Sequence, residues 1–345
     1  MCYRIFTENY EGDAIVKYLL PDKKQYKINL HAHTVISDGM LSASEIKSLY
    51  KSNGYSAVAF TDHDILIRHN ELTDGEFVAL NGYEYKINEN GAKHAENRLK
   101  TFHINMIAKS PDIDYQVCFN PYNITTEAER YIPFAKYRGG FYDYDFSASG
   151  VNEVADIAHR NGFLVHYNHP VWCMNDFVLN DIYGFDGVET INTNSCVIKD
   201  LPEDTDVIYE RFLREERRPY PLACDDNHNQ RGTADSLKSF NMVALDVLSY
   251  ENIISALESG DTYASSGPII KSLTAQDGNV YIVVENTVHI SMRTEGRRAK
   301  TVYDKSGVDR AVFHIREDDG YVRFVLTDKE GNHAYTRAYE VREIL

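Results

Sequence analysis

Short apolar runs rich in β-branched and aromatic residues recur between residues 26 and 265, and segments with helical spacing lie between several of them. Runs of this kind are typical of buried strands. The segment SASEIKSLYKSNG predicts a helix, because Ser42 and Glu45 fit a capping box and Gly54 is a stop signal. The predicted strands are YKINLHAH, SAVAFTDH, FVALNGYE, FHINMIA, FLVHYNHP, DGVETIN, YPLACDDNH and NMVALDV.

Alternation of strands with helices predicts an α/β fold with parallel pairing through crossovers. Seven or eight such units favour a distorted (β/α)7 barrel, and an open doubly wound sheet is the alternative. Residues 110–150 are rich in Tyr, Pro, Gly and Asp, and we expect an insertion near the functional site there.

After YASSGP the pattern changes to period-two runs such as VYIVVEN and YVRFVLTD, separated by turn residues. This pattern predicts a small antiparallel β-sandwich. We therefore divide the chain into an amino-terminal extension (1–25), a barrel (26–265) and a carboxyl-terminal β-rich domain (266–345).

The composition of the chain argues against some classes of binding partner. A formal net charge of −16 over 345 residues argues against nucleic acid or an anionic membrane, since both bind through clustered Lys and Arg. No signal-peptide pattern and no apolar run of membrane-spanning length is present, so we expect a cytoplasmic protein. The five cysteines are scattered and form no C-x-x-C pair, which argues against a disulfide framework or a thiolate zinc site.

Histidine and carboxylate residues gather at the ends of the predicted strands. In a βα barrel these ends converge on one face, and residues i and i+2 of a strand point the same way. Imidazoles combined with carboxylates suit zinc, manganese or iron. The sequence therefore predicts a metal centre with more candidate ligands than one ion could use: His31, His33, Asp62, His63, Asp64, Glu84, His103, His169, Asp226 and His228.

Taken singly, an H-x-H pair is weak evidence, because a histidine at a strand end is more often a core or surface residue than a ligand. Recurrence at six strand ends in chain order is harder to explain by packing. Burial of so many polar groups without a metal would be costly.

Six segments around these residues resemble, in order and spacing, the motifs of the PHP family, named for polymerase and histidinol phosphatase. The segments are NLHAHTVISDG, FTDHD, NGYE, FHIN, NHP and CDDNH. The resemblance covers residues 29–228. It implies a distorted seven-stranded βα barrel, two or three divalent metal ions, and hydrolytic activity that is usually phosphoesterase activity.

Residue by residue, the resemblance implies three metal positions. Glu84 would bridge the first two, and the third would use Asp38 where some family members have histidine, so this third site is weaker, differently populated or empty. The implied ligands are His31, His33, Glu84 and Asp226 for the first metal, Glu84, His103 and His169 for the second, and Asp38, His63 and His228 for the third.

Two positions have neighbours that compete for the same role. Spacing of i and i+2 relative to His228 favours Asp226 over Asp225, which should point the other way. A residue before proline is held extended, which favours His169 over His166 at its strand end.

Two aspartates and three arginines near the motifs each have two interpretations. Asp62 and Asp64 flank His63 and would orient ligands, or Asp64 would act as a catalytic acid or base; a turn role is equally open. Arg68, Arg138 and Arg231 would bind an anionic substrate, since a guanidinium matches phosphate or carboxylate, and a solvated surface role is the alternative.

The first functional hypothesis is a metal-dependent phosphoesterase that hydrolyses a small phosphate ester by attack of metal-bound hydroxide. The second is a carboxyl ester or carbamate hydrolase that uses the same metals, because YASSGP and the β-rich tail resemble a PHP branch with that chemistry. The third is a non-catalytic binding protein that works through the β-tail. In the first two cases the partner is a small-molecule substrate, phosphorylated in the first.

Overall fold

The computed structural model describes residues 16–89, 99–124, 126–175, 181–202, 206–231 and 234–345. It shows a mixed α/β fold with one large sheet and one four-stranded sheet. The predicted helix after the first motif is confirmed: the Ser42 hydroxyl accepts from the Glu45 amide, and the Ser42 amide donates to the Glu45 carboxylate. Among the described helices, none has the length and apolar character needed to cross a membrane.

The first part of the chain alternates strands and helices. Short 3-10 turns at Asn70–Leu72 and Glu127–Phe134 interrupt the connections. The main elements are β2 (Lys24–Asn29), α1 (Ala43–Ser52), β3 (Tyr55–Phe60), β4 (Val78–Asn88), β5 (Thr101–Ala108), α2 (Ala148–Arg160), β6 (Phe163–Tyr167), β7 (Gly187–Asn192), α3 (Thr193–Ile198), α4 (Val207–Arg214), β8 (Tyr220–Cys224), β9 (Phe240–Leu245), α5 (Tyr250–Ser259) and β10 (Thr262–Ser265).

The strand order β9-β2-β3-β4-β5-β6-β7-β8 places consecutive strands side by side. β2, β3 and β4 are parallel, as are β6, β7 and β8. The prediction of parallel pairing throughout is wrong for β5, which is antiparallel to both β4 and β6, and for β9, which is antiparallel to β2. Hydrophobic periodicity indicates that a strand exists, but the route of the connection decides its direction.

The barrel is not closed by a backbone ladder between β8 and β9 in the part of the chain that the structure describes. A side chain joins these two strands instead. The Ala223 amide donates to Asn241 Oδ1 at 3.1 Å, and Asn241 Nδ2 donates to the Ala223 carbonyl at 2.9 Å. The observed architecture is therefore a mixed sheet in which the edge strand β8 returns to β9 and contacts it through an asparagine.

The carboxyl-terminal strands are antiparallel, as predicted. One sheet has the order β1-β11-β12-β15, while β13, β14, β16, β17 and β18 extend the large sheet through the pairing of β17 with β10. A shared apolar core, with Ile270 and Ile282 from one sheet and Ile290 and Phe324 from the other, lies between them. The elements are β1 (Lys17–Leu20), β11 (Ile269–Gln276), β12 (Asn279–Glu285), β13 (His289–Thr294), β14 (Ala299–Tyr303), β15 (Arg310–His314), a 3-10 turn (Glu317–Asp319), β16 (Tyr321–Thr327), β17 (His333–Thr336), β18 (Tyr339–Glu340) and α6 (Val341–Ile344).

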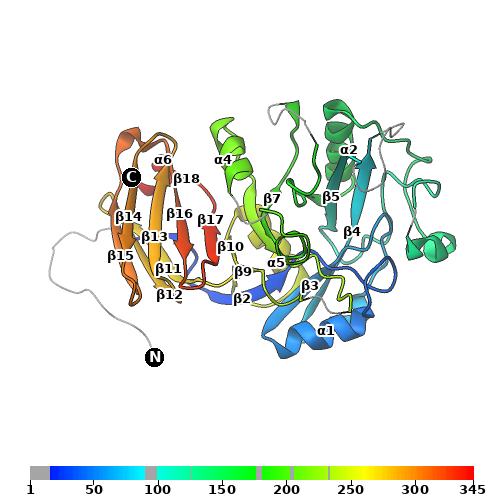
Figure 1. Cartoon of the computed structure of the whole chain (residues 1–345), viewed down its shortest axis with the longest axis horizontal. Helices are drawn as coiled ribbons and strands as arrows, with labels where there is room; N and C mark the ends of the chain where they lie inside the picture. Colours follow the sequence, from blue (N-terminus) through cyan, green and yellow to red (C-terminus); the bar gives the residue numbers. More distant parts are fainter. Residues whose placement is uncertain (1–15, 90–98, 125, 176–180, 203–205, 232–233) are drawn as a thin grey trace.

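Strand pairing crosses the proposed domain limits at two points. β1 lies within the expected amino-terminal extension and pairs with β11 of the tail. β10 pairs with β9 on one side and with β17 on the other, so the sheet continues across the limit at residue 265. In Figure 1 the tail strands lie at one end of the molecule, and β4, β5 and α2 lie at the other.

The expected insertion packs against the segments that carry the metal-ligand candidates. Phe119, Ile124 and Ala128 form an apolar cluster with Ile36 and Ile65. Ile36 lies between the second and third candidate ligands of the first motif, and Ile65 lies two residues after the histidine of the TDHD motif. The insertion therefore supports one side of the candidate site.

Candidate metal centre

The first and last motifs lie side by side although they are far apart in the sequence. The His33 amide donates to the Asn227 carbonyl at 3.1 Å, and the Asp226 amide donates to the His31 carbonyl at 3.1 Å. Because these backbone contacts follow the ends of β2 and β8, they bring the H-x-H pair and the D-x-H pair to one edge of the large sheet.

Eight of the nine predicted ligands form three groups, and within each group one ligand atom per residue lies within 4.8 Å of the others. The ninth, His169, places its Nε2 3.0 Å from Glu84 Oε1. This division differs from the implied one at the second position, where His63 joins Glu84 and His103 in place of His169. The groups are His31, His33, Glu84 and Asp226; His33, Asp38, His63 and His228; and His63, Glu84 and His103.

The first group converges on a single point. Asp226 Oδ1 lies 3.2 Å from His31 Nε2 and 3.0 Å from His33 Nε2. The two imidazole nitrogens are themselves 3.1 Å apart.

Two buried carboxylate oxygens in this group, Glu84 Oε2 and Asp226 Oδ1, each have an imidazole nitrogen 3.0 Å away but form no well-oriented hydrogen bond. Buried acceptors without well-oriented donors are costly, and imidazole and carboxylate ligands are those that zinc, manganese and iron prefer. The residues present therefore fit a divalent metal ion.

Backbone conformation at the last ligands departs from the extended geometry expected from sequence. The φ angle is +51° at Asp226 and +25° at His169. The argument that a residue before proline is held extended is therefore wrong for His169, although its ring does reach Glu84. Such left-handed residues are rare outside glycine and often lie at functional sites, where surrounding contacts hold them.

Asp225 and His166, the alternatives to Asp226 and His169 in the sequence, contact groups outside the ligand cluster. Asp225 accepts from the Tyr50 hydroxyl at 2.8 Å and from backbone amides of the segment before β9, so it points away from the cluster as expected. His166 is buried beside the Tyr220 hydroxyl, with 2.8 Å between Nε2 and the oxygen, and belongs to none of the three groups.

Asp62 and Asp64 lie beside the cluster without joining a group. Asp62 Oδ1 accepts from the Thr34 amide and the Ser37 hydroxyl, both at 2.8 Å, and so holds the loop that leads to Asp38. Asp64 Oδ2 lies 3.0 Å from Lys86 Nζ. Lys86 was missed by the sequence reasoning, although it lies two residues after Glu84 on the same face of β4.

Glu189 and Asn168 orient ligand candidates and were also missed. Glu189 Oε1 lies 2.8 Å from His31 Nδ1, while its Oε2 accepts from the His169 amide at 2.8 Å. Asn168 Nδ2 donates to Glu84 Oε1 at 2.8 Å. Carboxylates that bind the outer nitrogen of a ligating histidine are usual around metals. The available signal was a glutamate within the predicted strand DGVETIN.

The three arginines proposed for substrate binding are exposed. Arg138 lies over the Tyr115 ring, with 3.7 Å between the guanidinium carbon and the ring centre. Neither Arg68, Arg138 nor Arg231 makes a hydrogen bond or ion pair with a described member of the cluster. Their role in binding substrate stays a prediction.

Burial and charge oppose each other in this centre. Burial lowers the pKa of His31, but Asp226, Glu84 and Glu189 raise it more, to about 9. At His103 burial dominates and lowers the pKa to about 4 despite the nearby Glu84. Burial raises the pKa of Glu84 and Asp226, yet the surrounding imidazoles hold both below their usual values. The carboxylates are therefore charged acceptors that favour a cation.

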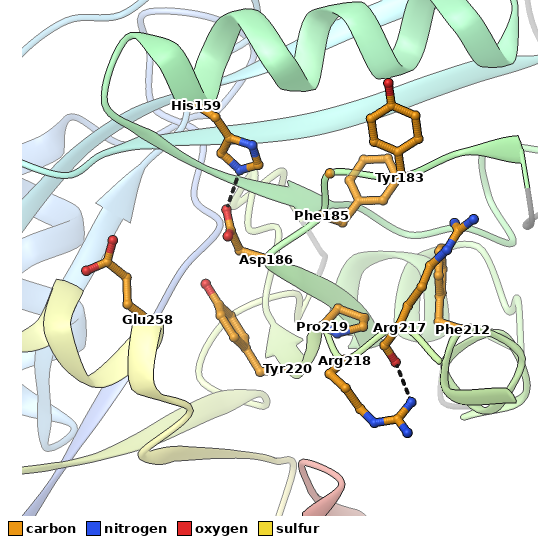
Figure 2. A pocket seen from close by; sticks show the side chains of 11 residues that line it. His159, Tyr183, Phe185, Asp186, Phe212, Arg217, Arg218, Pro219, Tyr220 and Glu258 are labelled. Carbon is orange, nitrogen blue, oxygen red and sulfur yellow. Dashed lines mark hydrogen bonds and ion pairs between the residues drawn. The ribbon is translucent and has the colours of Figure 1, made fainter. Parts of the chain in front are cut away.

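A separate cavity of about 410 Å³ lies near the amino ends of β7 and β8, whereas the ligand cluster follows the carboxyl ends of β2 and β8. Figure 2 shows His159 and Asp186 paired in its wall, at 2.9 Å, with Tyr220 nearby. None of the nine predicted ligands lines this cavity. It is therefore distinct from the candidate metal centre.

The fold and the site together define a mixed α/β protein with a candidate centre for divalent metal ions. No protein-family model matches the chain, and no curated protein matches it. A Bacteroides vulgatus two-domain protein, described as containing a predicted PHP-like metal-dependent phosphoesterase, is similar in structure at 15% identity and a TM-score of 0.43, over 94% of this chain and 98% of that one.

Two further solved structures are similar. One is a Bifidobacterium adolescentis protein proposed to be a metal-dependent phosphoesterase (14% identity, TM-score 0.36, 62% of this chain and 91% of that one). The other is a Chromobacterium violaceum amidohydrolase with bound sulfate and no metal (15%, 0.36, 68% and 96%). The description of the Bacteroides vulgatus protein names the same family that the sequence motifs resemble. The clustered side chains, and not these similarities, support a metal centre.

Proposed function

We propose that the chain is a metal-dependent hydrolase that cleaves a small phosphate ester. The observation that supports this proposal is the convergence of imidazoles on two buried carboxylate oxygens that form no well-oriented hydrogen bond. The metal candidates are zinc, manganese and iron, and the nine predicted ligands would hold two or three ions. When bound, these ions would supply Lewis acidity and activate water near neutral pH.

The side chains of the cluster have separate tasks in this proposal. Glu84 lies between His31 and His33 on one side and His103 on the other, so its carboxylate would be shared between two metal positions. Glu189 fixes the direction of His31 by holding its Nδ1. Asn168 does the same for Glu84.

Exposure indicates the side from which substrate enters. The side chains of His31 and His33 are fully buried, whereas Asp38 is 37% exposed and His63 and His228 are each 12% exposed. The group around Asp38 therefore lies at the opening of the centre. The ester would approach from that side, where the nearby loop is held by Asp62.

The test uses the full chain loaded with manganese, zinc or iron and measures phosphate release from an aryl phosphate. Turnover should fall to background in His31→Ala and Asp226→Ala, because each removes a ligand of the first group. His314→Ala is the control, since this exposed histidine lies on β15 of the tail. Equal turnover in His31→Ala and the wild type would overturn the proposal.

A carboxyl ester or carbamate hydrolase is the second candidate. The observation that favours it is the aromatic character of the insertion, where Tyr122 and Phe141 are exposed and Phe119 packs beside Tyr137. An apolar wall suits an aryl ester. Turnover of an aryl ester without turnover of an aryl phosphate would favour this candidate, and a metal-free, inert protein would favour a binding role for the β-tail.

A further inference from the structure

Lys199 is a cation at the edge of the metal centre that the sequence motifs do not include. It follows α3, which begins directly after β7, and it is exposed. Its Nζ donates to Asn194 Oδ1 at 3.2 Å and lies 4.7 Å from the centre of the Trp172 ring. Two neighbours therefore fix the position of an otherwise flexible ammonium group.

Both neighbours of Lys199 contact predicted ligands. Asn194 Nδ2 lies 3.2 Å from His228 Nδ1. The centre of the Trp172 ring lies 5.0 Å from that of His103 and 4.9 Å from that of His169. One side chain therefore separates Lys199 from predicted ligands of two metal positions. Asn194 lies between it and His228, and Trp172 lies between it and the pair His103 and His169.

We propose that Lys199, Asn194 and Trp172 form a subsite for a second anionic group of the substrate, beyond the ester that reacts. This inference rests on the proposed function and deepens it. Asn194 and Trp172 lie between the ammonium and the imidazoles, so Lys199 contacts a part of the substrate outside the metal cluster. The substrate class is a small phosphate ester that also carries a carboxylate or a second phosphate.

Charge supports this assignment. An ammonium group would pair with a negative group of the substrate that lies beyond the reach of the metal ligands. An ammonium has three donors, and the hydrogen bond to Asn194 uses one of them. In the described parts of the chain no carboxylate forms an ion pair with Lys199, so its charge is available to a ligand.

The experiment measures ligand binding, so that it is independent of turnover. Three non-hydrolysable ligands are titrated by calorimetry into the manganese-loaded full chain: phenylphosphonate, 4-carboxyphenylphosphonate and 1,4-phenylenebisphosphonate. The second and third add a carboxylate and a phosphonate to the first. Variants are Lys199→Met, Lys199→Arg and, as a matched control, Lys305→Met, which removes an exposed lysine from a turn of the tail.

The wild type should bind at least one of the dianionic ligands about tenfold more tightly than phenylphosphonate, as a charge-assisted hydrogen bond would give. Lys199→Met should lose this preference while its affinity for phenylphosphonate stays within about twofold. Lys199→Arg and Lys305→Met should keep the preference. The dianionic ligand that binds more tightly than phenylphosphonate shows whether the second group is a carboxylate or a phosphate.

Three outcomes would overturn the subsite: no preference in the wild type, an unchanged preference in Lys199→Met, or an equal loss in Lys305→Met. Failure of the proposed function gives a different result, because the manganese-loaded chain would then leave the corresponding aryl phosphates intact even where the phosphonates bind. Absence of binding by all three phosphonates would overturn the subsite and count against the phosphoesterase as well.

Discussion

Two clusters of charged side chains in this molecule, each with a buried member at its centre, differ in where their positive charge comes from. In the first, Arg323 of β16 is fully buried and bonds to Asp206 and to Glu210 of α4, with 2.8 Å between its Nε and Glu210 Oε1. Arg293 also pairs with Asp206. We call this the arginine cluster, and its two cations match its two carboxylates.

The metal centre has the opposite balance. Its carboxylates Asp38, Glu84 and Asp226 face imidazoles, whose charge depends on protonation, and two of their oxygens form no well-oriented hydrogen bond. A buried charge must be paired or coordinated. The arginine cluster therefore balances its own charge at the contact between α4 and the tail sheet, whereas we propose that the metal centre takes up an ion from solution.

Arg323→Met should lower the stability of the protein more than any other substitution in this series. Removal of one partner of a buried pair leaves uncompensated charge, so the free energy of unfolding should fall by about 3–5 kcal/mol. Metal content should not change, because the arginine cluster includes no predicted ligand. Denaturant titration and plasma emission on the same samples check both parts. A variant as stable as the wild type would show that Arg293 alone neutralises the cluster.

Glu84→Gln should have the reverse pattern. Glu84 belongs to two ligand groups, so metal affinity should fall by at least about 100-fold, the upper end of what loss of an outer partner causes. The stability of the metal-free protein should fall less than in Arg323→Met, because glutamine loses the attraction of the imidazoles but keeps an acceptor for His103 and Asn168. Competition with a chromophoric chelator measures the affinity. Unaltered affinity would remove Glu84 from the set of ligands.

Metal removal should lower the stability of the wild type and of Arg323→Met by the same amount. An ion that binds only the folded state at about 100 times its dissociation constant adds about 2.7 kcal/mol. Thermal unfolding before and after chelation measures the difference. The shift should vanish in Glu84→Gln, and a shift that persists there would place the stabilising ion elsewhere.

Glu189→Gln should have the smallest effect of the series. Glutamine keeps an acceptor for His31 Nδ1 but loses the charge, so metal affinity should fall about tenfold. Stability of the metal-free protein should fall only slightly, although the amide nitrogen of glutamine then faces the His169 amide that now donates to Glu189 Oε2. A pure structural role would instead lower stability and leave the affinity unaltered, which the same chelator competition and denaturant titration would reveal.

The ligand candidates could be predicted because their signal repeats. Histidines and carboxylates recur at successive strand ends, and the periodicity of each strand locates its end. The helix of residues 43–52 could be predicted from its capping residues for the same reason: the contacts are local.

Other features depend on contacts between distant segments. The direction of β5 depends on how the chain returns, and the approach of β8 to β9 depends on the side chain of Asn241. Glu189 and Lys199 carry no periodic signal: Glu189 contacts His31, which is distant in sequence, and the proposed role of Lys199 depends on Trp172 from another segment.

The most direct test of the central claim is anomalous diffraction from crystals of the full chain grown with manganese or zinc. The account predicts at least one anomalous peak within coordination distance of His31, His33, Glu84 and Asp226, and further peaks beside His103 or His228. An ordered cluster with no anomalous peak among these side chains, in protein shown to be saturated with metal, would contradict it.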